Sequence, residues 1–438
     1  MYVQYGDGRL EFELPDCEVD VAEPDRGTTV DVREAAKRAL SAPHGPNLGD
    51  LVDQGDEVAI VVTDVTRSAP DDVLLDAMLE ELPAPRDVVT IVVGLGLHRP
   101  MTEAELREGL GEHAPLSINH DPDQVVRVGT VAVGNGGDEA DDGDEADGEP
   151  NEIPIEVHEA VADADVVLST GVVEPHQYAG FSGGAKTVAI GAGGEPLIRE
   201  THGPAMLSRP GVRLGRIEDN PFRETIDRAG DLVGPDFCCN VATGEAGVLD
   251  VAAGRPRPVV RELAETARSA SSARVSGEEY DVVVAGVPAP KDANLYQASR
   301  AATYVLLGPY DPVAPGGRIV VPARLPEGAG TGTGERRFRR RLENATDAES
   351  LYERLQRGYE PGAQRAFVLA RALRDADLWV TNAGGAAPVD SPLVRTTPDV
   401  VDAIPAGSRV LVVPDAIHTL VRSPSNSSLG SISDRTRS

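Results

Sequence analysis

The chain has 438 residues, 40% of them hydrophobic and 26% charged, which is the composition of a folded protein with room for two domains. Its net charge of −31 and its aromatic content of 4% argue against a nucleic-acid-binding surface, which needs basic patches and stacking rings. No apolar run approaches the roughly 18 residues that indicate a membrane span, so we expect no membrane segment.

Basic residues are almost all arginine, since Lys and Arg together number 41 and only Lys37, Lys186 and Lys291 are lysines. An acidic, lysine-poor surface indicates adaptation to molar salt, where the Debye length falls to about 3 Å and self-repulsion is screened. Three cysteines cannot form a disulfide framework, and the N-terminus shows no secretory signal, so we expect a cytoplasmic, halophilic protein. The Arg-rich run 335–343 is interpreted as a solvated helix face rather than an RNA site.

Short β-branched runs recur along the chain, and helical patterns separate them. The predicted strands are 57–63, 88–94, 165–171, 281–287, 317–323, 377–382 and 408–414. The predicted helices include 71–82, 102–111, 258–270 and 363–376. Buried strands that alternate with helices predict an α/β protein with mainly parallel sheets.

Polar stretches set the predicted domain limits. Residues 134–150 carry many acids and no large apolar side chain, which predicts a disordered insertion, and 422–438 is expected to be a flexible tail. A polar, Gly/Ser-bearing segment suggests a boundary between an N-terminal domain, 1–275, and a C-terminal α/β domain, 276–407. We leave open whether the last strand, 408–414, returns to the first domain.

Four predicted strands end in loops that carry polar or cationic side chains. The residues concerned are Asp64 and Arg67, His98 and Arg99, His176 and Lys186, and Lys291, Gln297 and Arg300. Because ligands of open α/β sheets bind beyond the carboxyl ends of the strands, this pattern predicts one anion-binding active site. The arginines also have a simpler interpretation as partners of local carboxylates.

The eight histidines divide into two groups. His98, His176 and His202 each adjoin Gly, Pro or Arg in a loop that follows a predicted strand, and they are candidates for chemistry. The others are interpreted as hydrogen-bonded structural or turn residues, and they are His44, His113, His120, His158 and His418.

The run GFSGGAK at 180–186 places one of only three lysines in a glycine-rich loop. Glycines such as Gly183 and Gly184 let backbone N–H groups approach a phosphate, although a plain tight turn is an equally simple interpretation. The run lacks the Gly-Lys-Ser/Thr ending of a Walker loop, and GLGLHR does not supply a Gly-x-Gly-x-x-Gly motif. Because a desolvated lysine can form a Schiff base, a pyridoxal-phosphate- or nucleotide-binding protein is an alternative.

Several of these segments together resemble the nickel-pincer-nucleotide-dependent lactate racemase family. The matching segments are DVTR (64–67), GLHRPMTEAEL (96–106), NHD (119–121), EPHQYAGFSGGAK (174–186), TH (201–202) and PKDANLYQ (290–297). The resemblance runs from the N-terminal YGDGRLEFELPD to about residue 415, so it covers nearly the whole chain of a haloarchaeal-like member. The long segments around His98 and His176 are its specific part.

The resemblance implies a cofactor and a role for each matching residue. The cofactor is a pyridinium mononucleotide with thioamide and thiocarboxylate groups, covalently attached to Lys186, with nickel held between its sulfurs and ring carbon. The expected site residues are, for the cofactor, Lys186, Asp64, Gly183 and Gly184; for nickel, His202; for acid–base catalysis, His98 and His176; and for substrate, Arg67, Tyr296, Gln297 and Arg300. The N-terminal domain would bind the cofactor, and the site would lie in the cleft between the domains.

The implied reaction is the interconversion of D- and L-2-hydroxy acids, with lactate as the expected substrate. Hydride transfer to an electron-poor pyridinium avoids a carbanion, while one histidine takes the hydroxyl proton and the other returns it. Malate, an aromatic hydroxy acid or a sugar acid are alternative substrates, and cofactor-maturation proteins are implied partners. Arg300 stands where the family has lysine, which favours a different hydroxy acid, and Ile190 lies where a proline is usual.

Overall fold

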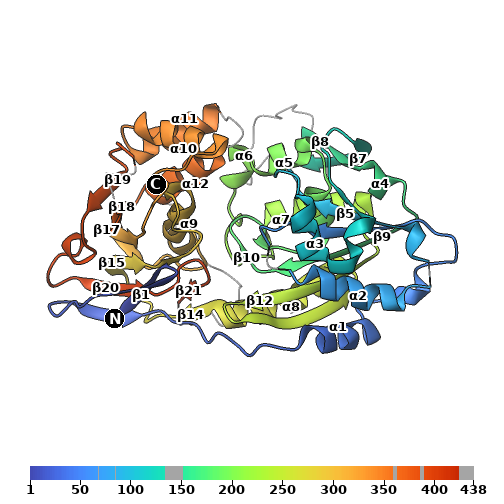
Figure 1. Ribbon diagram of the computed structural model, residues 1–438. Helices are drawn as coiled ribbons and strands as arrows, with labels where there is room; N and C mark the ends of the chain where they lie inside the picture. The colour runs from blue at the N-terminus through green and yellow to red at the C-terminus, as the bar shows by residue number, and fades with distance from the viewer. Residues whose placement is uncertain (68, 84, 134–150, 359–362, 385–388, 424–438) are drawn as a thin grey trace, which may run out of the picture. The chain divides into compact units, whose positions relative to one another are not determined.

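The computed structural model describes residues 1–438 except 68, 84, 134–150, 359–362, 385–388 and 424–438 (Figure 1). The chain forms two compact units. Unit 1 contains Met1–Asp25, Gly203–Gly215 and Ala270–Ser438, and unit 2 contains Arg26–His202 and Arg216–Ser269. Each unit is built on a six-stranded, mainly parallel sheet, which confirms the predicted α/β class.

The sheet of unit 2 has the strand order β13-β12-β9-β4-β5-β6. Its strands are β4 (Val58–Thr63), β5 (Val89–Gly94), β6 (Ser117–Asn119), β9 (Val166–Val173), β12 (Phe237–Gly244) and β13 (Gly247–Gly254). Only β12 and β13 pair antiparallel. The chain adds β5 and β6 on one side of β4 and then β9 on its other side, so the strand order reverses between β4 and β9. Dinucleotide-binding folds have this order too, and ligands bind where it reverses.

The helices of unit 2 connect these strands. They are α1 (Val32–Ser41), α2 (Asp71–Glu81), α3 (Glu103–Leu110), α4 (Glu159–Ala162), α5 (Glu195–Thr201), α7 (Pro221–Val233) and α8 (Pro256–Ser271). Shorter turns are the 3-10 helices η1 (Leu48–Asp50), η2 (Arg86–Val88) and η3 (Gly111–Leu116), and the π-helix η4 (Thr187–Gly191). Two short antiparallel pairs complete the unit: β7 (Val125–Val133) with β8 (Asn151–His158), and β10 (Pro175–His176) with β11 (Gly180–Phe181).

Alternate residues of β4 belong to two different cores. Val58, Ile60 and Val62 pack in the core that contains the apolar residues of α1 and α2. Ala59 and Val61 pack in the core that contains residues of α4 and η4. Both faces of the sheet are therefore covered, which explains why the strand is apolar without alternation.

Unit 1 contains the second sheet, with the all-parallel order β19-β18-β17-β15-β20-β3. Its strands are β3 (Glu18–Val21), β15 (Tyr280–Ala285), β17 (Val313–Pro322), β18 (Ala376–Thr381), β19 (Val394–Thr397) and β20 (Arg409–Val413). The helices are α6 (Pro204–Leu207), α9 (Leu295–Leu306), α10 (Thr333–Glu343), α11 (Ala348–Arg357), α12 (Gln364–Ala372) and the 3-10 helix η5 (Val401–Ala403). Smaller pairings join β1 (Tyr2–Gly6) to β2 (Gly8–Glu11) and β16 (Val287–Pro288), and β14 (Ser272–Arg274) to β21 (Leu420–Arg422).

Every strand and helix predicted from the sequence is present, but the chain is divided differently from the predicted domains. Residues 1–25 belong to unit 1, because β3 pairs with β20. Strand 408–414, which is β20, lies between β15 and β3, so it completes the sheet of unit 1 and does not return to the first domain. Residues 203–215 also belong to unit 1.

The two predicted flexible segments fall largely outside the described residues. The insertion 134–150 lies entirely outside them, and so does the tail from residue 424 onward. Arg422, where the tail was expected to begin, is the last residue of β21 and is paired with β14. Among the helices that the structure describes, none is both long and apolar enough to cross a membrane.

Candidate functional site

The carboxyl ends of β4, β5 and β9 bring together the residues that the sequence placed in strand-end loops. Asp64 and Arg67 follow β4, His98 follows β5, and Glu174 and His176 follow β9. The three strands are parallel neighbours, so their following loops meet at one edge of the sheet. This edge includes the point between β4 and β9 at which the strand order reverses, where ligands of such sheets bind.

Asp64 makes a direct contact with His98. Its Oδ2 lies 2.7 Å from Nδ1 of the imidazole, and its Oδ1 accepts hydrogen bonds from the backbone N–H and the hydroxyl of Thr66. Burial raises the pKa of Asp64, but the hydrogen bonds from His98 and Thr66 more than offset this, and the pKa lies below its usual value. Asp64 was expected to contact the cofactor; in the structure both of its oxygens are used to hold His98 and its own loop.

Arg67 forms an ion pair with Glu174 across the point of strand reversal. Its Nη1 lies 2.7 Å from Oε1 of Glu174, and about a third of each side chain is exposed, at 33% and 36%. Ion pairs with this exposure contribute little to stability. A substrate carboxylate that binds Arg67 would therefore either share the guanidinium with Glu174 or displace Glu174 from it. Glu174 begins the matching segment 174–186, but no role was expected for it.

The glycine-rich loop is shaped by packing as well as by backbone conformation. Gly183 and Gly184 have φ values of +81° and +61°, and a Cβ at these positions would lie 2.6 Å from Val173 and 2.5 Å from Val260. The N–H of Gly184 donates to Oδ1 of the buried Asn240 at 2.8 Å. This donor is thus already used within the protein, which weakens the interpretation of the loop as a phosphate cradle.

Lys186 follows this loop and precedes the π-helix η4. Burial lowers the pKa of Lys186 to about 7, and the positive charges of Arg67 and Arg223 act in the same direction. Arg223 is itself buried, at 2% exposure, and its Nη2 lies 2.9 Å from Asp227. A substantial fraction of Lys186 is therefore a neutral amine near neutral pH, which is the nucleophilic form.

The π-helix that follows Lys186 lies against the loop that carries His98. A Cβ on Gly94 would lie only 3.1 Å from the Cα of Gly191, and the N–H of Gly96 donates to the carbonyl of Gly191 at 2.7 Å. Glycine is required for so close a backbone approach. This contact fixes the lysine-bearing segment relative to the His98 loop, and single-turn π-helices are frequent at functional sites.

His202 caps the C-terminus of α5. Its Nδ1–H donates to the carbonyl of Ile198 at 2.9 Å, which places the lone pair on Nε2. Burial, helped by the charge of Lys186, lowers the pKa of His202 to about 4, so the ring is neutral at neutral pH. The rings of Tyr178 and Phe222 pack edge-on against it, with centroids 5.6 and 5.3 Å away. A neutral imidazole with one nitrogen fixed by a carbonyl is the usual state of a metal ligand.

His176 shares these aromatic neighbours but has the opposite hydrogen-bonding pattern. Its ring centroid lies 5.7 Å from that of Tyr178 and 6.3 Å from that of Phe222. Its Nδ1 accepts hydrogen bonds from the backbone N–H groups of Tyr178, at 3.3 Å, and Ala179, at 3.1 Å. Tyr178 and Phe222 were not identified from the sequence, because aromatic residues there have no signature apart from core packing.

The three residues expected to bind substrate from the second half of the chain lie on α9 of unit 1. The Nε of Arg300 donates to Oε1 of Gln297 at 2.9 Å, so the two are held in a fixed relation. Asn294 caps the helix by accepting from the N–H of Gln297. Tyr296 instead packs edge-on against the buried Phe338 at 5.4 Å, which ties its ring to the core of its own unit.

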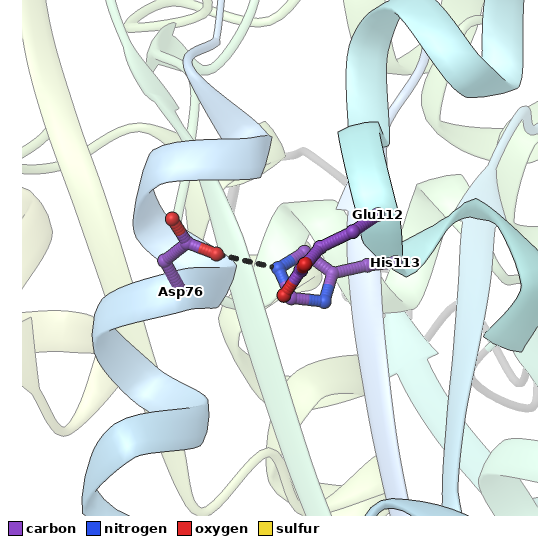
Figure 2. A group of neighbouring side chains, drawn as sticks. All are labelled: Asp76, Glu112 and His113. Carbon is purple, nitrogen blue, oxygen red and sulfur yellow. Dashed lines mark hydrogen bonds and ion pairs between the residues drawn. The ribbon is translucent and has the colours of Figure 1, made fainter.

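A separate cluster in unit 2 has the composition of a metal site (Figure 2). It consists of Asp76 on α2 and Glu112 and His113 in η3, and Nε2 of His113 lies 2.8 Å from Asp76. Arg33 donates to Asp76 at 2.7 Å, and Arg86 lies 3.1 Å from Glu112. Each carboxylate already has a guanidinium partner, so we interpret the cluster as a charge-neutralising contact.

Comparisons with known proteins agree with the resemblance noted in the sequence. The family model for the lactate racemase N-terminal domain matches residues 5–215. A lactate racemase from Thermoanaerobacterium thermosaccharolyticum is 25% identical over 446 aligned residues, which cover 96% of this chain and 98% of that protein. A lactate racemase from Lactiplantibacillus plantarum is 26% identical over 289 residues, or 62% of each chain.

Solved structures show that the fold is shared. The lactate racemase apoprotein from Thermoanaerobacterium thermosaccharolyticum superimposes with a TM-score of 0.80 at 22% identity, over 96% of this chain and 99% of that chain. A protein from Thermotoga maritima superimposes with a TM-score of 0.62 at 18% identity, over 91% and 99% of the two chains. The whole architecture of this chain, and not only its first half, therefore has known counterparts.

Proposed function

This chain belongs to the lactate racemase family and is an isomerase, and from that premise we propose that it interconverts the D- and L-enantiomers of a 2-hydroxy acid, with lactate as the expected substrate. The observation that carries the proposal is the state of Lys186. A lysine whose pKa is lowered by burial to about 7, and whose charge acts on His202, is suited to covalent attachment of a cofactor.

The residues at this edge fit the nickel-pincer pyridinium mononucleotide that the family resemblance implies. Lys186 offers a neutral amine for the covalent link, and His202 offers an Nε2 lone pair to nickel, with Nδ1 fixed by a carbonyl. The buried Nδ2 of Asn240, beside the glycine-rich loop, finds no hydrogen-bond partner among the described residues. When bound, the group supplies an electron-poor ring that accepts and returns a hydride.

The protein's own residues would handle the substrate's protons and its carboxylate. His98 and His176 follow β5 and β9, the two parallel strands that flank β4. They would exchange the hydroxyl proton, because an imidazole changes its protonation readily near neutral pH. Arg67 would bind the substrate carboxylate in place of Glu174, with Gln297 and Arg300 as further contacts. These cations also counter the net charge of −31, which would otherwise repel an anionic substrate.

A cytoplasmic location in a salt-rich cell, with maturation proteins that deliver the cofactor, is part of the proposal. Cys17, Cys238 and Cys239 are all free thiols, as expected for a reducing compartment. The acidic, lysine-poor composition supports function at high salt.

Conversion of single enantiomers tests the function. The protein would be produced together with cofactor-forming proteins, purified in molar salt and incubated with pure D- or L-lactate, and both enantiomers would be measured by chiral chromatography. We expect equimolar D- and L-lactate from either starting material, together with bound nickel. Protein that contains nickel and the cofactor but converts no hydroxy acid would contradict the proposal.

A substrate panel tests the choice of lactate. Lactate, malate, an aromatic 2-hydroxy acid and a sugar acid would be compared in the wild type and in Arg300→Lys. Because a lysine is a compact point charge and an arginine is a planar fork, we expect the variant to change relative KM values by about tenfold, mainly through the carboxylate. A preference for another hydroxy acid over lactate would support the proposed racemase activity and change the expected substrate.

A further inference from the structure

Asn240 is a fully buried residue of β12 that lies directly beneath the loop of the cofactor lysine. We infer that it is a positioning residue for Lys186, because its side-chain amide faces both ends of the turn that carries the lysine. The inference rests on the proposed function in one respect, namely that the cofactor is attached to Lys186. Asn240 acts through the turn and has no assigned contact with substrate.

Lys186 lies within a tight turn that begins at Gly184 and ends at Thr187. The N–H of Thr187 donates to the carbonyl of Gly184 at 3.0 Å and closes the turn. Helix α7 packs against the turn from outside, since a Cβ on Gly230 would lie 2.4 Å from the Cβ of Ala185. The two ends of the turn therefore determine where the backbone of the lysine lies, and with it where the amine can reach.

Asn240 holds the first end of this turn. Its Oδ1 accepts from the N–H of Gly184 at 2.8 Å. Because a backbone N–H can only donate, this contact determines which end of the side-chain amide is the oxygen. The Nδ2 atom lies on the other side, 3.2 Å from where a Cβ on Gly171 would be. Gly171 is the residue of the neighbouring strand β9 with which Asn240 is paired.

The hydroxyl of Thr187, at the second end of the turn, borders the same place. A Cβ on Gly171 would lie 2.9 Å from Oγ1 of Thr187, so a larger residue there would press on both polar atoms. Nδ2 of Asn240 is buried and has no hydrogen-bond partner among the residues that the structure describes. A buried N–H without an acceptor is unfavourable, and a threonine hydroxyl can accept as well as donate. Rotation of the Thr187 side chain toward Nδ2 gives Asn240 a hold on both ends of the turn.

Asn220 shows how a buried asparagine of unit 2 is ordinarily bonded. Like Asn240, it is 0% exposed. Its Oδ1 accepts from two backbone N–H groups at the start of α7, and its Nδ2 donates to two backbone carbonyls at 2.8 and 2.9 Å. The donor of Asn240 is instead kept beside the hydroxyl of the residue that follows the cofactor lysine. This difference favours a role in positioning the turn over a role in packing alone.

Hydrogen exchange in the full-length apoprotein tests the inference without any cofactor. We expect the amide of Gly184 to be protected, and Asn240→Leu should raise its exchange rate by roughly tenfold, the effect of one lost hydrogen bond. Thr187→Val should give a smaller rise, and Thr187→Ser, which keeps the hydroxyl, should restore protection. Thr225→Val is the matched control, because it removes a buried hydroxyl that donates to the carbonyl of Pro221 in its own helix. An unchanged Gly184 amide in Asn240→Leu, or the same rise in Thr225→Val, would overturn the inference.

Attachment of the cofactor extends the test with a readout other than activity. In protein matured by cofactor-forming proteins, intact mass gives the fraction of chains that carry an adduct on Lys186. Because attachment depends on where the amine lies, Asn240→Leu should load at least about tenfold less than the wild type, and Thr187→Val should also load less. Thr187→Ser and Thr225→Val should load like the wild type. Full loading of both Asn240→Leu and Thr187→Val would overturn the inference.

Failure of the proposed function is a separate result. The exchange rates of the apoprotein variants would be as stated, but the matured wild type would racemise no hydroxy acid.

Discussion

Buried polar groups have different electrostatic environments in the two units of this protein. In unit 1 the fully buried Asp292 accepts two hydrogen bonds from Arg324, at 2.5 and 3.1 Å, and Arg324 also pairs with Asp7 at 3.0 Å. At the sheet edge of unit 2, burial pushes Lys186 and His202 toward their neutral forms, and positive charges near Lys186 add to the effect. The first arrangement stabilises charge, whereas the second makes a neutral amine and a neutral imidazole available for chemistry.

The difference shows which buried groups lower the stability of this fold. A group whose pKa is shifted by burial toward its neutral form destabilises the folded state at any pH where the unfolded chain would be charged. Such groups cluster at functional sites more often than in structural pairs. The comparison therefore predicts that substitutions in the two units have opposite effects on the free energy of unfolding. The experiments below test this prediction.

The largest expected effect is that of Lys186→Met. Without the amine no cofactor can be attached, and we expect racemase activity to fall to background. The apoprotein should become more stable. Since the folded pKa of about 7 lies below the ordinary 10.5, the wild type loses stability as pH falls from about 10 to 7, and the variant should gain ~2 kcal/mol or more at pH 7. Chemical unfolding of the two apoproteins at pH 7 and pH 10 measures this, and a destabilised variant would contradict the comparison.

Asp292→Asn should have the opposite effect on stability. It removes the charge that the two hydrogen bonds from Arg324 compensate inside unit 1, and we expect the free energy of unfolding to fall by about 2 kcal/mol. Urea unfolding of the same apoprotein gives the value. A neutral or stabilising result would mean that this pair does not differ from Lys186 and His202 in unit 2.

Asp71 provides a test within unit 2, because it is buried and has no cationic partner among the residues that the structure describes. Thr63 and Thr170 donate to its two oxygens at 2.8 and 2.5 Å, yet burial raises its pKa from 3.8 to about 6. The folded state therefore holds this proton more tightly, and stability falls as pH rises from about 4 to 6. Asp71→Asn should remove that fall and be ~2 kcal/mol more stable than the wild type at pH 7. Unfolding curves at pH 4 and pH 7 measure it, and an equal difference at both pH values would refute the assignment.

Substitution of His120 should have the smallest effect on stability, and only at acidic pH. It is 3% exposed and its ring lies edge-on to that of His158, with centroids 5.6 Å apart. Burial, with His158 adding to it, lowers the pKa of His120 to about 4, so stability is lost as pH falls from about 6.5 toward 4. His120→Leu should reduce this loss by ~1 kcal/mol. Melting temperatures of the variant and the wild type between pH 4 and pH 7 measure it, and an equal loss in the two proteins would contradict the assignment.

The sequence predicted seven strands of the two sheets, namely β4, β5, β9, β15, β17, β18 and β20, but not β3, β6, β12, β13 or β19. It named candidate site residues but not the partners that hold them. β4 and β5 could be predicted because both of their faces are buried, so each strand is a continuous apolar run in the sequence. The pair β7 and β8 was missed, because the acidic segment 134–150 separates the two strands and gives no hairpin signal. Arg67 was expected to bind substrate, with a local carboxylate as the simpler alternative partner, and the carboxylate that it contacts, Glu174, lies 107 residues away.

The division of the chain into two units also could not be predicted from local sequence. A polar segment near residue 275 suggested one boundary, but β3 near the N-terminus pairs with β20 near the C-terminus. Nothing in either segment specifies the other, because parallel pairing between distant strands depends on the whole fold. The contact between His98 and Asp64 was hidden for a similar reason, since it joins loops that follow two different strands.

The most direct test of the account is the mass of Lys186 in protein matured by cofactor-forming proteins. Intact mass followed by peptide mapping should show a nucleotide-sized adduct on Lys186 that forms without borohydride, nickel in equal amount, and no adduct in Lys186→Met. An unmodified Lys186 in protein that racemises lactate would contradict the assignment of this lysine as the attachment point. An adduct retained only after borohydride reduction would instead indicate an imine, as in a pyridoxal-phosphate protein.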